Sequence, residues 1–359
     1  MSQRMVDQFM EMVRIDSESG EEAAMMEYLL QAIPAEGGEA ELDGYGNLIA
    51  RFPARGCEGA DAILLSCHAD TVKPGKGIEP VIEDGVIRSA GDTILGADDK
   101  AGIAEVLEAL RTAEVRPPVE LAISRQEEVG LLGAKNLDFS RLTAKKGFLM
   151  DGDVLDTIVI GGPSYFAIDV SITGKAAHAG MEPEKGVSAI LAASRAITAL
   201  RLGRLDHETT ANVGVIEGGI IRNGVPDRCK FLAECRSADH EKAVKLNDEM
   251  LKIIREQIES VGAKVELTSD NLCRAVDIPE DSWTVNIAKQ ALKAKLGIDA
   301  NCVFITGFTD ASIYNNMGIE MAVVGMGAQN EHSTEERIAV AEMERATRAL
   351  VEMLRLSAE

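Results

Sequence analysis

Basic residues, aromatic residues and long apolar runs are all scarce in this sequence of 359 residues. Lysine and arginine number 37 against 59 aspartate and glutamate residues, so the formal net charge is −22. This excess of acids argues against a partner made of nucleic acid or anionic lipid, because both attract basic surfaces. No stretch of about 18 apolar residues occurs, so we expect no transmembrane helix. The N-terminal stretch also lacks the apolar segment of a signal peptide.

Aromatic residues make up only 4% of the chain, whereas hydrophobic residues as a whole make up 46%. The cores must therefore consist of aliphatic side chains and methionine, at a content that is ordinary for a folded protein. The six cysteines include no CxxC pair. In a chain of this length we expect them to be reduced and mostly buried thiols of a cytoplasmic protein.

Short apolar runs alternate with helical patterns over most of the chain. Near-continuous apolar runs predict strands buried on both faces of a mostly parallel sheet. These runs are residues 62–67, 119–124, 147–151, 301–306 and 321–327. Helices are predicted between them, for example at residues 101–112 and 283–296. Another helix is expected after Ser19, since Glu22 follows three residues later, as in a capping box. The fold class is therefore α/β.

The middle of the chain has a different pattern. Alternating apolar and polar residues predict half-buried strands, and two longer patterns predict helices. In order they are a strand at 165–174, a helix at 186–202, strands at 210–219 and 229–237, a helix at 240–261 and a strand at 263–269. This βαββαβ order builds a ferredoxin-like α+β domain. We predict a catalytic domain of residues 1–164 and 275–359, interrupted by an inserted domain of residues 165–274.

Carboxylates and histidines follow several of the apolar runs or open the next helix. Ligand sites of α/β sheets gather at the carboxyl ends of the strands. These residues are His68, Asp70, Asp98, Asp99, Glu127, Glu128, Asp151, Asp153, Glu331 and His332. A single acid at such a place is usually a helix cap or a turn residue. Two histidines with several carboxylates around one crevice are instead what a site for two metal ions needs. Such ligands suit zinc, and also manganese or cobalt.

The segments HADTV, GADDKAG and QEEVG, with Asp151 and His332, resemble the M20 family of metallopeptidases, and most closely its peptidase T-like (tripeptidase-like) branch. The resemblance covers essentially the whole chain, because the βαββαβ insertion is similar to that family's lid domain. It implies two divalent metal ions: Asp98 bridges them, His68 and Asp151 complete one site, and Glu128 and His332 complete the other. Composition alone does not choose Asp98 over Asp99, and Asp153 is a weaker alternative to Asp151.

The resemblance also implies the parts of the reaction. Glu127 is expected to be the general base that activates a metal-bridging water. Asp70 is expected to accept a hydrogen bond from the imidazole of His68 and so fix its tautomer. In the inserted domain, His178 matches the lid histidine that polarises the scissile carbonyl, in its own or a partner's active site. Asn223 and Arg236 match positions that hold the carboxylate of the substrate. A homodimer through the lid domain is implied as well.

The sequence therefore predicts a cytoplasmic enzyme that cleaves an amide bond in short peptides, most like a tripeptide aminopeptidase. One alternative is an N-acyl-amino-acid amidohydrolase or carboxypeptidase on the same scaffold. A more remote alternative is a non-catalytic metal-binding homologue. The M42 aminopeptidases share an EEVG-like motif, but their inserted domain is all-β, whereas this insertion contains two helical patterns.

Overall fold

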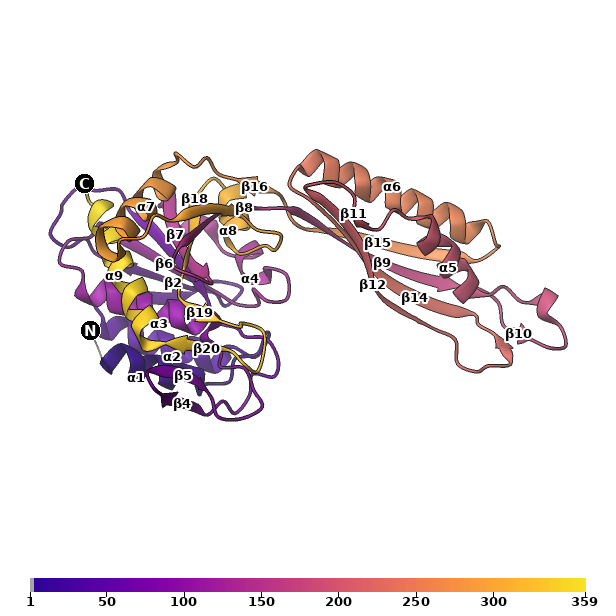
Figure 1. Ribbon diagram of the computed structural model, residues 1–359, viewed down its shortest axis with the longest axis horizontal. Helices are drawn as coiled ribbons and strands as arrows, with labels where there is room; N and C mark the ends of the chain where they lie inside the picture. Colours follow the sequence, from indigo (N-terminus) through magenta and orange to yellow (C-terminus); the bar gives the residue numbers. More distant parts are fainter. Residues whose placement is uncertain (1–2) are drawn as a thin grey trace. The chain divides into compact units, whose positions relative to one another are not determined.

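The computed structural model describes residues 3–359, and their contacts divide the chain into two compact units. Unit 1 combines the N-terminal part up to Gly161 with Asp277–Glu359, and unit 2 is the inserted segment Gly162–Val276. In Figure 1, unit 1 contains the indigo to magenta beginning of the chain and its orange to yellow end, and unit 2 contains the segment between them. No helix within residues 3–359 is long and apolar enough to cross a membrane.

Unit 1 is built on a mixed sheet whose centre is parallel. Along the sheet the strands are β1 (Glu39–Leu42), β2 (Leu48–Phe52), β6 (Val119–Ser124), β3 (Ile63–His68), β7 (Lys146–Gly152), β18 (Glu320–Gly325), β8 (Thr157–Gly162) and β16 (Val276–Asp277). A further strand, β17 (Asn301–Phe304), pairs with β8. The adjacent strands β6, β3, β7 and β18 are all parallel. Strands β3 and β6 are buried at every position, which explains why their sequences are mostly apolar rather than alternating.

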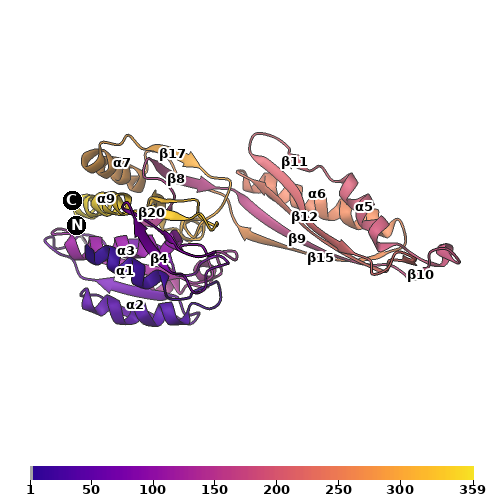
Figure 2. The same cartoon turned by 60° about the horizontal axis from the view of Figure 1, so that its bottom comes forward.

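Helices cover this sheet. They are α1 (Gln3–Val13), α2 (Ala23–Ala35), α3 (Ala97–Thr112), α4 (Leu132–Lys135), α7 (Trp283–Leu296), α8 (Ala311–Asn316) and α9 (Val340–Leu356), with a 3₁₀ turn at Phe139–Arg141. Helix α3 packs on β3 and β7, and α9 packs against both α3 and α7 (Figure 2). Helix α3 is buried on almost every side, so its first turn is held between the sheet and other helices. The predicted α/β class is confirmed.

A small antiparallel sheet of unit 1 contacts helix α3 through strand β19 (Ala328–Gln329). Its other strands are β4 (Pro80–Glu83), β5 (Val86–Ser89) and β20 (Arg337–Ala339). Its pairing of β5 with β20 joins the segment before α3 to the segment before α9. Two stretches that are about 240 residues apart in sequence are thereby brought together, as the hydrogen bond from Leu95 to Glu336 illustrates.

Unit 2 has the predicted βαββαβ order. Its elements are β9 (Ser164–Thr173), β10 (Ala177–His178), a 3₁₀ turn (Pro183–Lys185), α5 (Ala189–Ala199), β11 (Gly203–Arg204), β12 (Thr209–Gly218), β13 (Gly224–Val225), β14 (Arg228–Ser237), α6 (His240–Glu259) and β15 (Lys264–Cys273). The main sheet runs β11-β12-β14-β9-β15 and is antiparallel. Burial alternates along β9 and β14, and the buried side packs against α5 and α6 (Figures 1 and 2). Ile168, Phe231 and Ile254 are fully buried in this core.

Candidate metal centre

Three parallel strands of unit 1 end at the same edge of the sheet, and each carries polar residues there. Strand β3 ends at His68 and pairs with both β6 and β7. The residues that follow β6 include Glu127 and Glu128, and β7 contains Asp151 near its end. Since parallel strands place their carboxyl ends together, residues from positions far apart in sequence meet in one cluster.

The imidazole of His68 is oriented by a backbone carbonyl two residues further along the chain. Its side chain is 2% exposed, and its Nδ1 lies 2.9 Å from the carbonyl oxygen of Asp70. Donation of the Nδ1 proton to this carbonyl leaves the Nε2 lone pair available on the other side of the ring. Nε2 lies 3.0 Å from Asp98 Oδ1 and 3.6 Å from Asp151 Oδ1. A histidine that ligates metal usually donates its other ring proton in this way.

The carboxylate of Asp98 lies between two imidazoles. Its Oδ1 faces His68, whereas its Oδ2 lies 3.1 Å from Nε2 of His332. The same nitrogen of His332 lies 2.9 Å from Oε1 of Glu128. The backbone at the start of α3 departs from helical geometry at Asp98, with φ −78° and ψ 104°. One acid thus connects two groups of ligand atoms, one containing His68 and Asp151 and the other containing His332 and Glu128.

A positive charge would stabilise the carboxylates of this cluster. Burial raises the pKa of Asp151 to about 7, and the negative charge of Asp98 adds to this effect. Hydrogen bonds to Asp98 and then to Glu128 raise the pKa of His332 to about 10. The side chains of Asp98, Glu128 and Asp151 crowd together here and are only 13%, 7% and 8% exposed, while the His332 side chain is 56% exposed. A cation would stabilise these carboxylates. The imidazole nitrogens and carboxylate oxygens of this cluster are suitable ligands for two divalent metal ions such as zinc.

Asp99 lies beside this cluster, and the geometry also groups it with His68 and Asp151 as a set that could hold a metal ion. Its Oδ2 accepts a hydrogen bond of 3.0 Å from the backbone N–H of His68. Burial raises the pKa of the Asp99 carboxyl well above its ordinary value, and Asp151 adds to the shift. Asp99 therefore holds the end of β3 in place, while Asp98 faces both imidazoles. Asp153, the weaker alternative to Asp151, is exposed.

Gly102 makes room for Asp99 in the second turn of α3. A Cβ atom at this position would lie 2.1 Å from Asp99 Oδ1 and 2.3 Å from the backbone oxygen of Met150. Alanine in place of a helical glycine normally stabilises a helix by about 1 kcal/mol. Here the contact with backbone atoms of β7 outweighs that gain, because the sheet cannot move away without losing its own packing.

We expect Gly102→Ala to lower the free energy of unfolding by about 1–3 kcal/mol, the usual cost of overpacking. Chemical denaturation followed by circular dichroism measures this change. Gly91→Ala is the matched control, because a Cβ atom at Gly91 meets no atom within 4 Å. A Gly102→Ala protein as stable as the control would contradict the close contact.

Asp70 joins the end of β3 to the loop that follows β6. It is fully buried and accepts hydrogen bonds from the backbone N–H groups of Glu127 at 2.9 Å and Glu128 at 3.2 Å. Burial raises the pKa of Asp70, but hydrogen bonds from His68, Ser19 and the Glu127 amide outweigh it and hold the pKa below its ordinary value. Asp70 therefore fixes the backbone from which both glutamates project.

The predicted capping box of Ser19 and Glu22 is wrong. Helix α2 begins at Ala23, and the hydroxyl of Ser19 donates to Asp70 Oδ2 at 2.7 Å. Glu22 instead accepts from the backbone of Gly20 and pairs with Arg125. The polar pattern of a cap and the polar pattern of a long-range contact look the same in sequence, because both need a hydroxyl and a carboxylate before a helix. The N-terminal segment thus supports the cluster.

Glu127 is 7% exposed and stands among other acids. Burial raises the pKa of its carboxyl well above the ordinary value; His68 lowers it, whereas Asp151 and Asp310 raise it further. A raised pKa makes a carboxylate a stronger base than an ordinary glutamate. Glu127 is therefore suited to proton transfer, while its neighbour Glu128 contacts His332.

Two buried acids near the cluster were not predicted from the sequence. Asp310 is fully buried, accepts a hydrogen bond from the hydroxyl of Ser124, and raises the pKa of Asp151 and Glu127 by its charge. Glu336 is 1% exposed and accepts from the backbone at the start of α3. Asp310 lies in the segment GFTDA (residues 307–311), which is similar to a loop that lines the pocket in M20 peptidases, but the sequence alone gave it no role. Glu336 had no signal beyond its position four residues after His332.

The three predicted substrate-binding residues all belong to unit 2. His178 and Asn223 are neighbours there, because β10 pairs with β13 and the Asn223 carbonyl accepts from the N–H of Ala179 at 3.0 Å. Nδ1 of His178 accepts from the N–H groups of Gly180 and Met181 at 3.2 and 3.1 Å. Nδ1 is therefore unprotonated, so the neutral ring carries its proton on Nε2. The side chain is exposed.

Arg236 lies on β14, away from that hairpin along the strand. Its guanidinium carbon lies 4.3 Å from the centre of the Tyr165 ring, and it pairs with Glu234 at 2.8 Å. Stacking on an aromatic ring and a carboxylate partner both restrict the guanidinium to one plane. The structure therefore holds Arg236 in a defined orientation, and its role toward a substrate stays a prediction.

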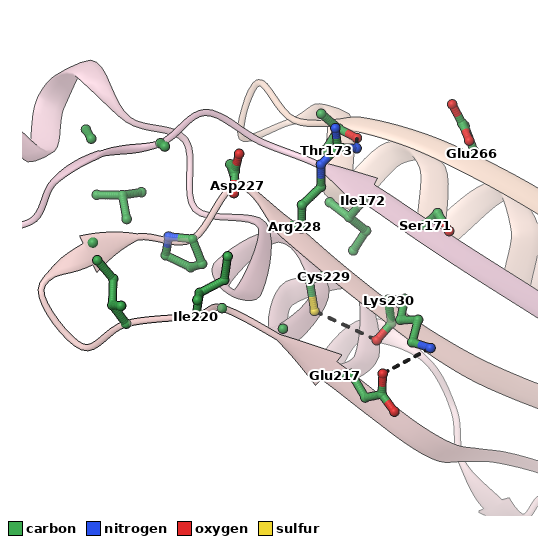
Figure 3. Close-up of a pocket in the computed structure, with 18 residues that line it drawn as sticks. Ser171, Ile172, Thr173, Glu217, Ile220, Asp227, Arg228, Cys229, Lys230 and Glu266 are labelled. Carbon is green, nitrogen blue, oxygen red and sulfur yellow. Dashed lines mark hydrogen bonds and ion pairs between the residues drawn. The ribbon is translucent and has the colours of Figure 1, made fainter.

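Unit 2 also contains a cavity of about 760 Å³ on its sheet, shown in Figure 3. Three of its charged lining groups have partners: Glu217 pairs with Lys230 at 3.0 Å, and Arg228 donates to the Thr173 hydroxyl at 2.7 Å. No histidine lines it. The cavity therefore lacks the groups that the cluster of unit 1 provides for catalysis.

Comparison with known proteins agrees with this arrangement. Residues 163–261 match the model of the peptidase dimerisation domain of M20 peptidases. The chain is 35% identical to the uncharacterized protein YqjE of Bacillus subtilis over 99% of both chains. The crystal structure of aminopeptidase PepT from Bacillus cereus is 37% identical with a TM-score of 0.90, covering 99% of this chain and 98% of that chain. A tripeptidase from Staphylococcus aureus is 33% identical with a TM-score of 0.93 over the same shares.

The fold and these relatives define the class of protein, and the carboxylate–imidazole cluster is consistent with it. A mostly parallel α/β unit with a strand-end cluster of potential metal ligands, interrupted by an α+β unit, is the architecture of a metallopeptidase. The chain belongs to the M20 family of metallopeptidases, in its peptidase T-like branch.

Proposed function

We propose that this protein is a tripeptide aminopeptidase that depends on two divalent metal ions. The observation that carries the proposal is the position of Asp98, whose two carboxylate oxygens face two different imidazoles at 3.0 and 3.1 Å. The similarity to an aminopeptidase PepT and a tripeptidase, each over nearly the whole chain, supports the choice of substrate.

The metal ligands in this proposal are His68, Asp98, Glu128, Asp151 and His332. Asp98 is shared, His68 and Asp151 hold one ion, and Glu128 and His332 hold the other. Zinc is the expected metal, with cobalt and manganese as alternatives of similar ligand preference. When bound, the two ions lower the pKa of a water molecule toward about 7 and polarise the peptide carbonyl.

Residues of unit 1 move and direct the proton. Glu127 takes a proton from the water whose oxygen bonds to the carbonyl carbon, and it delivers this proton to the nitrogen of the C-terminal dipeptide. The peptide C–N bond breaks, the dipeptide leaves as the amine, and the N-terminal residue is released as the acid. Its raised pKa makes the carboxylate a stronger base for the first half of this transfer. Asp70 holds the backbone N–H groups of Glu127 and Glu128, so that one glutamate stays free while its neighbour binds metal.

Residues of unit 2 bind the substrate in this proposal. The Nε2 proton of His178 is available to stabilise the oxygen of the scissile carbonyl as it gains negative charge. The orientation of that proton is supported by the two amides that donate to Nδ1. Asn223 and Arg236 hold the carboxylate of the peptide, for which the planar guanidinium is suited.

A substrate panel tests the proposed reaction. Purified enzyme loaded with zinc, cobalt or manganese is given free tripeptides, the same tripeptides acetylated at the amino terminus, dipeptides and N-acyl amino acids. Free tripeptides are expected to be cleaved fastest, with release of the N-terminal residue, and N-acetylation is expected to remove turnover. Preference for N-acyl amino acids, or release of the C-terminal residue, would instead favour the amidohydrolase or carboxypeptidase alternative.

We also propose that two copies associate through strand β12 of unit 2. Strand β11 pairs with Thr210 and Ala211 of β12, and Leu205 donates to the Thr209 carbonyl, so among the described residues no strand pairs with this edge of β12 from residue 212 to 218. Val215 and Ile216 on this strand are 41% and 51% exposed. An open strand edge with exposed apolar side chains favours pairing with another strand. The match to a peptidase dimerisation domain supports a second copy as the partner.

Ile216→Lys is expected to weaken the dimer at least about 10-fold, because the interface would have to bury an unpaired charge. Sedimentation equilibrium at several concentrations measures the dissociation constant. Ile82→Lys is the matched control, since Ile82 lies on β4 of unit 1 and is similarly exposed at 43%. A wild-type monomer, or equal dimerisation of both variants, would contradict the proposed interface.

We further place the enzyme in the cytoplasm. All six cysteines are free, and Cys67, Cys229, Cys235 and Cys273 are buried. Free thiols persist in reducing compartments, whereas oxidising compartments favour disulfides. Detection of the tagged protein in cell fractions tests this location.

A further inference from the structure

Glu336 is a buried acid whose carboxylate binds backbone rather than a charged side chain. Its Oε2 accepts from the N–H groups of Leu95 at 2.8 Å and Gly96 at 2.7 Å. Its Oε1 accepts from the N–H of Asp98 at 3.0 Å. Three amides at the start of α3 therefore converge on one side chain that is 1% exposed.

This arrangement explains how a carboxylate can be buried there. The first N–H groups of a helix have no partner within the helix, and they carry partial positive charge. Hydrogen bonds to an ionised acceptor are shorter and stronger than those between neutral groups. Burial raises the pKa of Glu336 to about 7, and the hydrogen bonds from the Asp98, Gly96 and Leu95 amides act in the opposite direction and favour the ionised form. The carboxylate thus provides an acceptor for three amides of the segment that leads into α3, where Gly96 has no side chain to serve as a cap.

Glu336 also comes from the same short segment as His332. The N–H of Glu336 bonds the carbonyl of Ser333 at 3.1 Å, which closes a turn between the two residues. One end of this turn presents the His332 imidazole to Asp98 Oδ2, and the other end holds the backbone N–H of Asp98. A single turn therefore contacts Asp98 at both its side chain and its main chain.

We propose that Glu336 is a positioning residue for the metal centre. By fixing the backbone of residues 95–98, it keeps the Asp98 carboxylate between His68 and His332, so that one acid can serve both metal ions. This inference rests on the proposed function, since it concerns the same site. It assigns Glu336 no contact with substrate or with the reacting atoms.

The variant Glu336→Gln tests this role with little change of shape. Glutamine keeps one carbonyl oxygen, which can still accept from Leu95 and Gly96, but its NH₂ group then faces the N–H of Asp98. The link to Asp98 is therefore lost while the other two bonds remain. Glu335→Gln is the matched control, because Glu335 is the adjacent residue and is exposed.

Metal binding is measured on metal-free protein by isothermal titration with zinc and by the visible spectrum of the cobalt-loaded form. The temperature is one at which circular dichroism shows all variants to be folded. Glu336→Gln is expected to bind metal 10- to 100-fold more weakly, the range typical for residues that orient ligands. Its cobalt spectrum is expected to change, whereas Glu335→Gln should match the wild type in both measurements.

The outcomes separate this inference from the proposed function. A wild-type protein that binds no pair of ions contradicts the proposed function itself. A wild type that binds two ions, with Glu336→Gln equal to it in affinity and cobalt spectrum, overturns the role of Glu336 alone. A purely structural role would lower the stability of the metal-free protein and leave both metal readouts unchanged, which also overturns it.

If Glu336→Gln does not fold, Glu336→Asp replaces it in the same measurements. Aspartate keeps the charge but is one methylene shorter, so it cannot reach all three amides at once. Weaker metal binding and an altered cobalt spectrum support the inference, and wild-type values for both overturn it.

Discussion

Glu127→Gln is expected to lower kcat for tripeptide hydrolysis by about 10²- to 10⁴-fold, the usual contribution of a general base. Glutamine has nearly the same shape and keeps the backbone N–H that Asp70 accepts, so the loop should stay in place. It cannot take a proton from water. Steady-state kinetics on a free tripeptide give the change in kcat, and metal analysis shows whether both ions remain.

The metal content decides how this result is interpreted. Equal metal in Glu127→Gln and in the wild type, with the loss confined to turnover, is the expected pattern. Glu58→Gln, a change at an exposed glutamate, serves as the control for loss of one negative charge. Turnover of Glu127→Gln within a few-fold of this control would remove Glu127 from the mechanism.

Asp98→Asn is expected to have the largest effect on metal binding. Asparagine keeps the shape of the side chain but loses the charge and one of the two acceptor oxygens that face His68 and His332. Affinity for both ions should fall by more than about 100-fold, beyond the 10- to 100-fold loss typical for residues that only orient a ligand. Titration of the metal-free protein with zinc measures this loss, and tripeptide turnover should fall with it.

Asp99→Asn is the matched comparison for Asp98→Asn. Asp99 accepts from the N–H of His68, and the carbonyl oxygen of asparagine can keep that bond. We therefore expect Asp99→Asn to retain both metal ions. If instead Asp99→Asn loses metal and Asp98→Asn keeps it, the bridging role belongs to Asp99 and the assignment of this cluster is wrong.

Much of the fold could be predicted because the burial of an element determines the pattern of polar and apolar residues in its sequence. Strands β3 and β6 are buried on both faces, so most of their residues are apolar and the two residue types do not alternate. Strands β9 and β14 are buried on one face, so polar and apolar residues alternate. Helix α7 begins and ends where its pattern predicts, at Trp283 and Leu296.

Short or exposed strands were not predicted. Strand β1 has four residues and no buried position, and β4 and β5 also have four residues each. Strands of this kind depend on pairing with neighbours rather than on their own composition. The sequence of β8 follows β7 after a short turn, and its pairing with β18 and β17 arises only from the assembled sheet.

The strand-end residues of the site could be located from the sequence, since strand order places them at one edge. The residues that hold them could not. Ser19 reaches Asp70 over 51 residues, and Glu336 reaches Asp98 over 238 residues. Such contacts have no local periodicity, and a serine or glutamate in a loop has many ordinary uses. The residues that hold a site in place are therefore harder to predict from the sequence than the site residues themselves.

The most direct test of the account is the number of metal ions that the wild-type chain needs for turnover. Metal-free protein is titrated with zinc or cobalt, bound metal is determined by mass spectrometry, and tripeptide hydrolysis is measured at each point. The account predicts two ions per chain at saturation, with turnover that rises as the sites fill and is lost again with a chelator. Full turnover in protein that holds only one ion per chain, or none, would contradict it.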